Sequence, residues 1–321
     1  MQNEKPLVTA VIPTRNRPEL VLRAVRSALA QTYANIEVIV VIDGPDQATV
    51  SALEAVQASD ARLCILPLPQ SVGACDTRNA GIKAARGEWI ALLDDDDEWF
   101  PEKLEKQIAL GEQSLHRLPV ITSRYVWRSP DIEQISPRSE PFLPIADYIM
   151  LRTELKPSER SLQTSTLVAR SALFKSCLFT SRLPQYQDLD WIIRAFDQPG
   201  VGLEFVPEPL SIWYVDRNRA AIGNRADWQS SLKWINQMRS HFSAESYASF
   251  VLVYVGASAS NQRDWRAFFP LLTLAVRKGK PTLVHLLIYF VRWMIPRNLR
   301  ISIRTMFEKR GQHSDTAHIT T

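Results

Sequence analysis

Four consecutive aspartates, Asp94 to Asp97, carry the clearest chemistry in this sequence. They directly follow residues 89–93, WIALL, whose apolar side chains predict a buried strand. Adjacent carboxylates repel one another, so the run is unfavourable unless cations or solvent relieve the repulsion. Hard divalent cations such as Mn²⁺ and Mg²⁺ prefer oxygen ligands, and one bound here would neutralise a diphosphate leaving group. The run therefore favours a metal site, and a solvated acidic turn or the cap of a helix beginning near Pro101 is the alternative.

A second acidic cluster, Asp188 and Asp190, opens a predicted helix over residues 188–196. Taken alone, Asp188 is typical of a helix N-cap, a common use of aspartate. The positive end of the helix dipole at this position is expected to keep the carboxyl group ionised. A catalytic role for Asp188 is favoured only in combination with the upstream acidic run.

Alternating strand and helix patterns in the first hundred residues predict the elements that must position these side chains. Strands are expected over residues 8–12, 36–42, 62–66 and 89–93, and helices from Pro18, around residues 50–56 and over residues 77–85. This order indicates an α/β fold with a mostly parallel sheet and right-handed crossovers. Ligands of such sheets bind beyond the carboxyl ends of the strands, where the unusual residues of this sequence lie.

The rest of the chain predicts a more mixed organisation. Short strands are expected over residues 123–128, 166–169 and 210–215, and the proline-rich stretch 128–144 predicts a long mobile loop. After Asn224 the pattern turns helical. We therefore expect a catalytic domain over residues 1–222, a helical subdomain over 223–307 and a disordered tail over 308–321.

Composition narrows the class of protein. A net charge of +4 and a pI near 9.0 suit an anionic small molecule or membrane surface and are too weak to indicate nucleic-acid binding. The three cysteines form no disulfide framework, which favours a reducing compartment. The N-terminus lacks a signal-peptide pattern, and residues 283–295 are too short to span a bilayer. We expect a cytoplasmic location, with peripheral attachment to the inner face of the membrane as an option.

Two blocks of this sequence resemble a known family. Residues 8–46, VTAVIPTRNRPELVLRAVRSALAQTYANIEVIVVIDGPD, and residues 77–107, TRNAGIKAARGEWIALLDDDDEWFPEKLEKQ, resemble glycosyltransferase family 2. The resemblance covers about residues 6–215. It implies a GT-A fold and an inverting transfer of sugar from a nucleotide-diphosphate sugar, with a lean to uridine, to a hydroxyl of a saccharide or lipid-linked saccharide.

The resemblance also implies roles for individual residues. Asp96 corresponds to the direct metal ligand, and Asp188 to the general base that deprotonates the acceptor. The residues expected to bind the donor nucleotide-sugar are Pro13, Thr14, Arg15, Asp43, Arg78, Asp94 and Asp95. The residues expected near the acceptor are Trp99, Thr164, Ser165 and Gln187. The sequence departs from the family pattern at Ile42, where many members have a second aspartate, and at Gln187, where glutamate is usual.

Three other classes of protein are alternatives to a glycosyltransferase. A nucleotidyltransferase or a dinucleotide-dependent dehydrogenase would need a glycine-rich loop after the first strand, and residues 13–20 contain no glycine. A catalytically inactive binding protein of the same fold fits the departures at Ile42 and Gln187, but the presence of Asp96 and Asp188 favours an enzyme.

Basic residues punctuate the apolar C-terminal region, among them Arg292, Arg297, Arg300 and Arg304. This pattern is typical of a helix that lies on an anionic membrane. It is equally typical of a helical subdomain that packs on the catalytic core or on a second subunit of a homo-oligomer. The sequence does not distinguish these possibilities.

Overall fold

The computed structural model describes residues 5–155, 160–215 and 227–295. Within these ranges the chain forms two compact units. The first holds residues 5–149 and 160–215, and the second holds residues 150–155 and 227–295. The boundary predicted between residues 222 and 223 lies outside the described residues. That residues 150–155 belong with the helical unit was not expected from the sequence.

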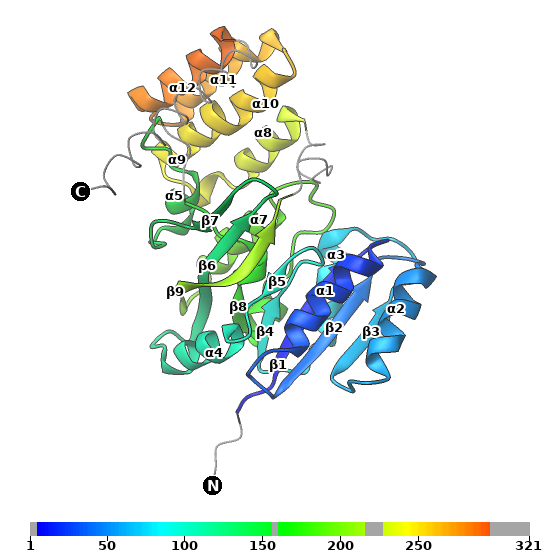
Figure 1. Cartoon of the computed structure of the whole chain (residues 1–321). Coiled ribbons are helices and arrows are strands. Elements are labelled where there is room, and N and C mark those ends of the chain that lie inside the picture. The colour runs from blue at the N-terminus through cyan, green and yellow to red at the C-terminus, as the bar shows by residue number, and fades with distance from the viewer. Residues whose placement is uncertain (1–4, 156–159, 216–226, 296–321) are drawn as a thin grey trace, which may run out of the picture. The chain divides into compact units, whose positions relative to one another are not determined.

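The described part of the first unit is built on a nine-stranded mixed sheet (Figure 1). Its strand order is β3-β2-β1-β4-β8-β6-β9-β5, with β7 paired to β6. The four strands β3, β2, β1 and β4 are parallel, β8 joins antiparallel to β4, and β9 runs parallel to β6. The strands are β1 (Val8–Thr14), β2 (Ile36–Ile42), β3 (Leu63–Pro67), β4 (Trp89–Leu92), β5 (Glu98–Trp99), β6 (Leu118–Arg128), β7 (Glu133–Ser136), β8 (Val168–Arg170) and β9 (Val201–Tyr214). The predicted α/β class with a mostly parallel sheet is confirmed.

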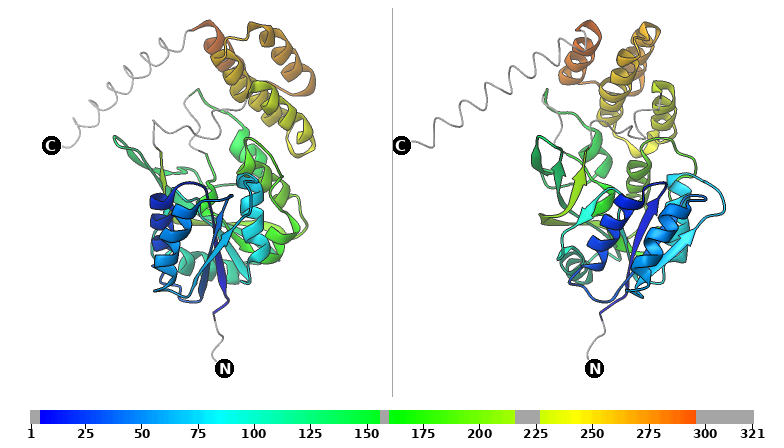
Figure 2. Two further views of the ribbon diagram at one scale, coloured as in Figure 1. Left: turned by 90° about the vertical axis from the view of Figure 1, so that its right-hand side faces the viewer. Right: turned by 45° about the vertical axis from the view of Figure 1, so that its right-hand side comes forward.

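Helices cover both faces of the parallel strands. The left view of Figure 2 shows α1 (Pro18–Leu29) and α2 (Gln47–Gln57) on one side and α3 (Ala74–Ala84) on the other. Alternate residues of a strand point to opposite faces, so Ala10 and Ile12 pack in the core with α1, whereas Val11 faces α3. Gly81 permits this close packing of α3, because a Cβ there would lie 2.5 Å from Val11 Cγ1.

The helix α4 (Lys103–Gln113) follows β5, and α5 (Ile145–Met150), α6 (Ser171–Ser176) and α7 (Gln187–Phe196) complete the first unit. A short 3₁₀ turn at Thr164–Thr166 precedes β8. The predicted helix over 188–196 therefore corresponds to α7.

The strand β1 continues to Thr14, past its predicted end at residue 12. Pro13 has no N–H to give to a neighbouring strand. The pairing of β1 with β4 ends at Val11 and Leu92, so no hydrogen bond between β1 and β4 is lost at Pro13. The continuation matters because it brings Pro13 and Thr14 to the edge of the sheet where β4 gives way to the four aspartates.

The sequence-based description of residues 118–215 was partly wrong. Both β6 and β9 are much longer than expected, and the stretch 128–144 is not a loop throughout because β7 pairs antiparallel with the end of β6. Pro207 and Pro209 obscured β9 in the sequence, since proline is rare within strands. The register between β6 and β9 shifts beside Ser123 and Arg124, which lets the prolines be accommodated without ending the strand.

The second unit is helical, as predicted, within residues 227–295. Its elements are α8 (Trp228–Gln237), η3 (Arg239–His241), α9 (Ala244–Ser249), η4 (Phe250–Val255), α10 (Gly256–Asn261), η5 (Trp265–Ala267), α11 (Phe268–Lys278) and α12 (Leu283–Met294). α9, η4 and α10 follow one another without a break, and η4 is a π-helical turn whose side chains are almost all buried. Ser249 accepts the backbone N–H of Arg152 and donates to the carbonyl of Met150, which attaches residues 150–155 to this unit.

None of the helices in the described ranges is both long enough and apolar enough to cross a membrane. All three cysteines are free, Cys64 exposed and Cys75 and Cys177 buried. The tail predicted to be disordered, residues 308–321, lies outside the described residues.

Candidate active site

A cavity of about 840 Å³ lies in the first unit at the carboxyl ends of β1, β2 and β4. Most of the residues nominated from the sequence line it: Pro13, Thr14, Arg15, Asp43, Arg78, Asp94, Asp95, Asp96, Thr164, Gln187 and Asp188. Trp99 and Ser165 do not. The acidic run after β4 and the acidic start of α7, far apart in sequence, therefore share one cavity.

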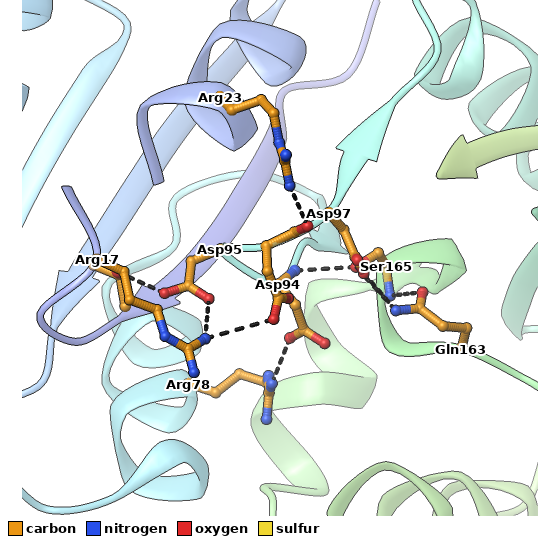
Figure 3. Close-up of polar contacts among 10 residues, drawn as sticks. Arg17, Arg23, Arg78, Asp94, Asp95, Asp97, Gln163 and Ser165 are labelled. Carbon is orange, nitrogen blue, oxygen red and sulfur yellow. Dashed lines mark hydrogen bonds and ion pairs between the residues drawn. The ribbon is translucent and has the colours of Figure 1, made fainter. Parts of the chain in front are cut away.

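The first two aspartates of the run are each held by a cation or a hydroxyl (Figure 3). Arg78 of α3 pairs with Asp94 at 2.7 Å. Asp95 accepts a hydrogen bond from the Thr14 hydroxyl at 2.7 Å and pairs with Arg17 at 3.0 Å. Asp95 is buried, and burial raises the pKa of its carboxyl group although Arg17 and Thr14 act in the opposite direction. Neighbouring carboxylates are tolerated here because cations from α3 and from the start of α1 offset their repulsion.

The third aspartate, Asp96, keeps about a quarter of its side chain exposed, and its carboxylate lies 3.5 Å from Arg17. Arg23 of α1 donates a hydrogen bond to its backbone carbonyl. The N–H of Asp97 donates to the carbonyl of Asp94 at 3.1 Å, which closes the run into a tight turn. We call Asp94 to Asp97 the acidic turn.

The fourth aspartate supports the turn from behind. Asp97 is fully buried, and its Oδ2 accepts hydrogen bonds from Gln163 at 2.5 Å and from the Ser165 hydroxyl at 2.6 Å. Ser165 in turn accepts the backbone N–H of Asp94 at 3.0 Å. Burial, reinforced by the charges of Asp94 and Asp96, raises the pKa of Asp97 well above its ordinary value. Asp97 and Ser165 thus fix the shape of the turn and do not face the cavity.

Two of the residues expected near the acceptor are therefore reassigned. Trp99 is only 4% exposed, and its indole N–H donates to the carbonyl of Ser165 at 2.8 Å. The Nζ atom of Lys103 lies over the Trp99 ring, 4.5 Å from its centroid. With Trp99 packed in the core and Ser165 fully buried, neither side chain reaches an acceptor, and both support the acidic turn instead.

The carboxylate of Asp43, at the end of β2, organises the loop that leads into α3. It accepts hydrogen bonds from the backbone N–H of Val72 at 2.6 Å, from the Ser71 hydroxyl at 2.8 Å and from Gly73 N–H at 3.2 Å. Although burial acts to raise its pKa, these hydrogen bonds lower it below the ordinary value. Arg15 is more than half exposed, bonds Ser71 at 2.6 Å and lies 3.8 Å from Asp43. The two residues form one side of the cavity.

Asp188 lies in the first turn of α7 and is not its N-cap, because Tyr186 occupies the cap position with a left-handed backbone at φ 62°. Its Oδ1 accepts the backbone N–H of Leu189 at 2.9 Å. Burial raises the pKa of Asp188; the Leu189 N–H and the charge of Arg78 lower it, and the charge of Asp94 raises it further. Desolvation thus acts against the helix dipole, which was expected to keep this carboxyl group ionised.

Comparison with known proteins agrees with this site. The family model described as glycosyl transferase family 2 matches residues 9–174, more than half of the chain. The chain belongs to glycosyltransferase family 2.

Among curated proteins, the chain is 29% identical over 278 residues to a protein of Escherichia coli (strain K12) named "Putative colanic acid biosynthesis glycosyl transferase WcaA", with 86% of this chain and 95% of that protein covered. It is also 24% identical to the amylovoran biosynthesis glycosyltransferase AmsB of Erwinia amylovora, over 73% of this chain and 78% of that one. Both of these relatives are named for the biosynthesis of a polysaccharide.

Solved structures identify the fold as GT-A. The structure of S. aureus TarS 1-349 in complex with UDP-GlcNAc is similar with a TM-score of 0.58 at 17% identity, covering 84% of this chain and 79% of that one. The mannosyltransferase PcManGT from Pyrobaculum calidifontis, in complex with GDP-Man and Mn²⁺, is similar with a TM-score of 0.54 at 14% identity, covering 92% and 89%.

The site of this family 2 enzyme fits a metal that is shared with the substrate. No group of three or more His, Cys, Asp or Glu side chains suited to a metal ion occurs in the described ranges, so an all-protein cage is absent there. Mg²⁺ is commonly held by one or two carboxylates together with substrate phosphates and water. Asp96, partly exposed in the cavity wall beside Asp95, supplies that kind of incomplete ligand set.

Several cavity residues were not nominated from the sequence. Arg17 binds the acidic turn, residues 72–74 lie beside Asp43, and residues 182–186 precede α7. Arg182 and Tyr186 both have positive φ, at 56° and 62°, which marks a constrained loop beside the cavity. Trp213 of β9 is 38% exposed on the cavity wall and meets Tyr125 edge to face, with ring centroids 6.0 Å apart. A basic residue just after the first strand was a signal for Arg17, but no sequence signal singled out Trp213.

Proposed function

We propose that this glycosyltransferase is a divalent-metal-dependent, inverting enzyme that transfers a sugar from a nucleotide-diphosphate sugar, UDP-linked by preference, to a hydroxyl of a saccharide or lipid-linked saccharide. One observation carries the proposal: the first three aspartates of the acidic turn line the same cavity as Asp188, with Arg78 acting electrostatically on Asp94 and on Asp188. A donor and an acceptor bound there would meet between a charge-neutralising site and a proton acceptor.

The donor nucleotide occupies the side of the cavity formed by β1, β2 and the start of α3. A carboxylate has about four lone-pair sites, and the loop after Ser71 already uses most of those on Asp43, so at most one is left for the imide N–H of a uracil. Arg15 is exposed enough to reach a phosphate, and Thr14 keeps Asp95 oriented toward the sugar or ribose.

Mn²⁺ or Mg²⁺, when bound, supplies positive charge that stabilises the departing diphosphate. Asp96 would hold it, with Asp95 or Asp94 close by. The positive charge of Arg78 adds to this field, because the residue is only 6% exposed and its guanidinium pairs with Asp94. PcManGT, the structural neighbour solved with Mn²⁺, supports the choice of cation.

The chemical step is a single displacement. The acceptor hydroxyl oxygen attacks the anomeric carbon from the face opposite the nucleotide, and its proton passes to a carboxylate oxygen of Asp188. The bond between the anomeric carbon and the phosphate oxygen breaks, and the nucleoside diphosphate leaves with the electron pair. Attack opposite the leaving group inverts the anomeric configuration. The raised pKa of Asp188 makes it a better proton acceptor than an ordinary aspartate.

The acceptor side is formed by Thr164, Gln187 and Trp213. Trp213, and not Trp99, is the aromatic side chain placed to stack on an acceptor sugar, because its ring is exposed in the cavity wall and contacts Tyr125 edge to face. A relative with 36% identity over 104 residues is named UDP-Glc:alpha-D-GlcNAc-diphosphoundecaprenol beta-1,3-glucosyltransferase WfgD, of Escherichia coli, and that match covers only 40% of its length. Its name supports a UDP-sugar donor and a lipid-linked acceptor. The three free cysteines suit a cytoplasmic location for the reaction.

The test is a thermal-shift screen of UDP-, GDP- and dTDP-sugars with Mn²⁺ and with EDTA, followed by NMR of the product formed with saccharide acceptors. A ligand of the folded state raises the apparent melting temperature, so a UDP-sugar should give the largest Mn²⁺-dependent rise. The product should carry the anomeric configuration opposite to that of the donor. Retention of configuration, or binding that EDTA leaves unchanged, would contradict the proposal. Donor binding without turnover for every acceptor tried would favour the inactive binding protein instead.

A further inference from the structure

Helix α12 of the second unit exposes an apolar stripe. Five large apolar side chains on it are between 40% and 71% exposed: Leu283, Leu287, Phe290, Val291 and Met294. Residues spaced by three and four positions share one face of a helix, so all five lie on the same side. The opposite side is used for packing, where His285, Tyr289 and Trp293 are buried.

A second set of exposed apolar side chains joins this stripe. Phe269 and Val276 of α11 are 71% and 57% exposed, and Trp265, just before α11, is also exposed. The buried Phe268 connects the two sets, because its ring contacts both Phe269 and Phe290 with centroids 5.1 and 5.8 Å apart. We call the combined surface the α11–α12 face; it consists of Trp265, Phe269, Val276, Leu283, Leu287, Phe290, Val291 and Met294.

The charge along this segment has one sign. From Trp265 to Ile295 the sequence has five Lys or Arg residues and no Asp or Glu. The whole chain has a net charge of only +4, so the residues outside this segment together sum to −1. Four of these cations are exposed next to the face, Arg266 beside Trp265, and Arg277, Lys278 and Lys280 between Val276 and Leu283. Within the described ranges none of the four takes part in an ion pair.

We propose that the α11–α12 face binds the surface of an anionic phospholipid bilayer, with its apolar side chains in the headgroup and acyl boundary and the flanking cations on the lipid phosphates. Apolar side chains flanked by Lys and Arg are the pattern that binds such an interface. Tryptophan is enriched at the interface between membrane and water, and Trp265 of this face is exposed. At 12 residues, α12 is about 18 Å long, short of the roughly 30 Å of a hydrocarbon core, so it lies in the surface and does not span.

Charge also argues against a second copy of this chain as the partner. A two-fold interface places the same surface of both subunits together, so the cations of one copy would face those of the other with no acid in this segment to pair them. An anionic bilayer offers many phosphates to the same cations and attracts them. The proposal rests on the proposed function only for its purpose, which is to bring the enzyme to an acceptor carried on a lipid.

The experiment is co-sedimentation of the full chain with vesicles of phosphatidylglycerol mixed with phosphatidylcholine, and with vesicles of phosphatidylcholine alone. Three variants are compared with wild type: F269S/L283S removes apolar surface, R277Q/K278Q/K280Q removes charge, and L115S is a matched control, because Leu115 is fully exposed in the first unit. Thermal unfolding and UDP binding with Mn²⁺ are measured for each, so that misfolding and loss of the donor site are detected separately.

Wild type and L115S should sediment with the anionic vesicles and only weakly with phosphatidylcholine. Removing three charges should weaken binding roughly a hundredfold, at about fivefold for each charge, and F269S/L283S should weaken it at least about tenfold. Equal binding of wild type to both vesicles, or unchanged binding of both surface variants, would overturn the proposal. So would a wild-type dimer in sedimentation velocity that F269S/L283S converts to monomer without vesicles present. Because UDP binding is scored independently, failure here leaves the proposed function standing.

Discussion

The acidic turn and Asp188 face the same cavity but are built in opposite ways. Each aspartate of the turn has at least one side-chain partner: Arg78 for Asp94, Thr14 and Arg17 for Asp95, Arg17 again for Asp96, and Gln163 and Ser165 for Asp97. The carboxylate of Asp188 accepts one hydrogen bond from the backbone N–H of Leu189, and within the described ranges it has no hydrogen bond to another side chain.

This difference separates two uses of a carboxyl group. A turn packed with cations and hydroxyls can hold negative charge in a fixed arrangement, as a charged diphosphate and its cation require. A carboxyl group that is desolvated and lightly bonded has a raised pKa and can take up a proton. This cavity therefore combines both kinds of surroundings, and substitutions of the acidic turn and of Asp188 should have different signatures.

The largest effect is expected for Asp188→Asn. The amide keeps the size of the side chain but cannot accept the acceptor's proton, so transfer should fall by about a thousandfold, within the usual range for a general base. Donor affinity should stay within about threefold, since the donor side of the cavity is untouched. Steady-state transfer and calorimetry with UDP and Mn²⁺ measure the two quantities. Asp197→Asn, at the far end of α7, is the control. Full turnover by the Asp188→Asn enzyme would refute the assignment of Asp188 as the general base.

Asp96→Asn should act on binding first. Loss of the carboxylate should weaken Mn²⁺-dependent UDP binding by at least roughly tenfold, as is typical when the surroundings of a metal are altered. In EDTA the variant and the wild type should bind UDP alike, because the direct protein contacts remain. Asp76→Asn on α3 is a matched control outside the cavity wall. Equal loss with and without Mn²⁺ would assign Asp96 to the nucleotide and not to the metal.

Arg78→Gln tests whether the charge of Arg78, which pairs with Asp94 of the acidic turn, also affects Asp188. Its charge lowers the pKa of Asp188, so removing it should raise that pKa further. A general base works only when deprotonated, and activity is lost as pH falls through its pKa; the acidic limb of the kcat/KM profile should therefore move to higher pH. Arg78→Lys, which keeps the charge, should leave the limb near that of wild type. An unchanged limb in Arg78→Gln would show that the two sides titrate independently.

The smallest effect concerns a buried charge outside the cavity. Lys103 is completely buried behind the turn, and desolvation lowers its pKa well below the ordinary 10.5. The folded state thus disfavours the protonated amine, and this penalty is full below the lowered pKa and fades as pH approaches 10.5. Lys103→Met should raise the free energy of unfolding by about 1–3 kcal/mol near neutral pH, and by less near pH 10.

Urea unfolding at the two pH values measures this change. Lys106→Met is the control, because Lys106 forms exposed ion pairs with Glu102 and Glu208, and exposed ion pairs contribute little to stability. Destabilisation by Lys103→Met would mean that the amine, through Gln107 and Trp99, is required to hold the acidic turn in place.

The first hundred residues were readable because their signals are local. The apolar strand Ile36–Ile42 and the helical repeat of α1 are patterns among residues that are close in sequence. The acidic run is recognisable in the same way, because it directly follows the apolar residues of β4. The structure of residues 118–215 was not predictable in this way, because β7 and the long β9 form by pairing with β6. That pairing leaves no pattern among residues close in sequence. Prolines that would end an isolated strand are accommodated there by a register shift.

The sequence by itself determined the residue types of the site and the family to which the chain belongs: four aspartates after a buried strand, and Asp188 at the start of a helix. Only the tertiary structure decided which of them face the cavity. It buried Trp99, Ser165 and Asp97 behind the turn, exposed Trp213 in their place, and brought Arg17 to the carboxylates. The physical reason is that residue type fixes what a side chain can do, whereas desolvation, pairing and direction depend on parts of the chain that are distant in sequence.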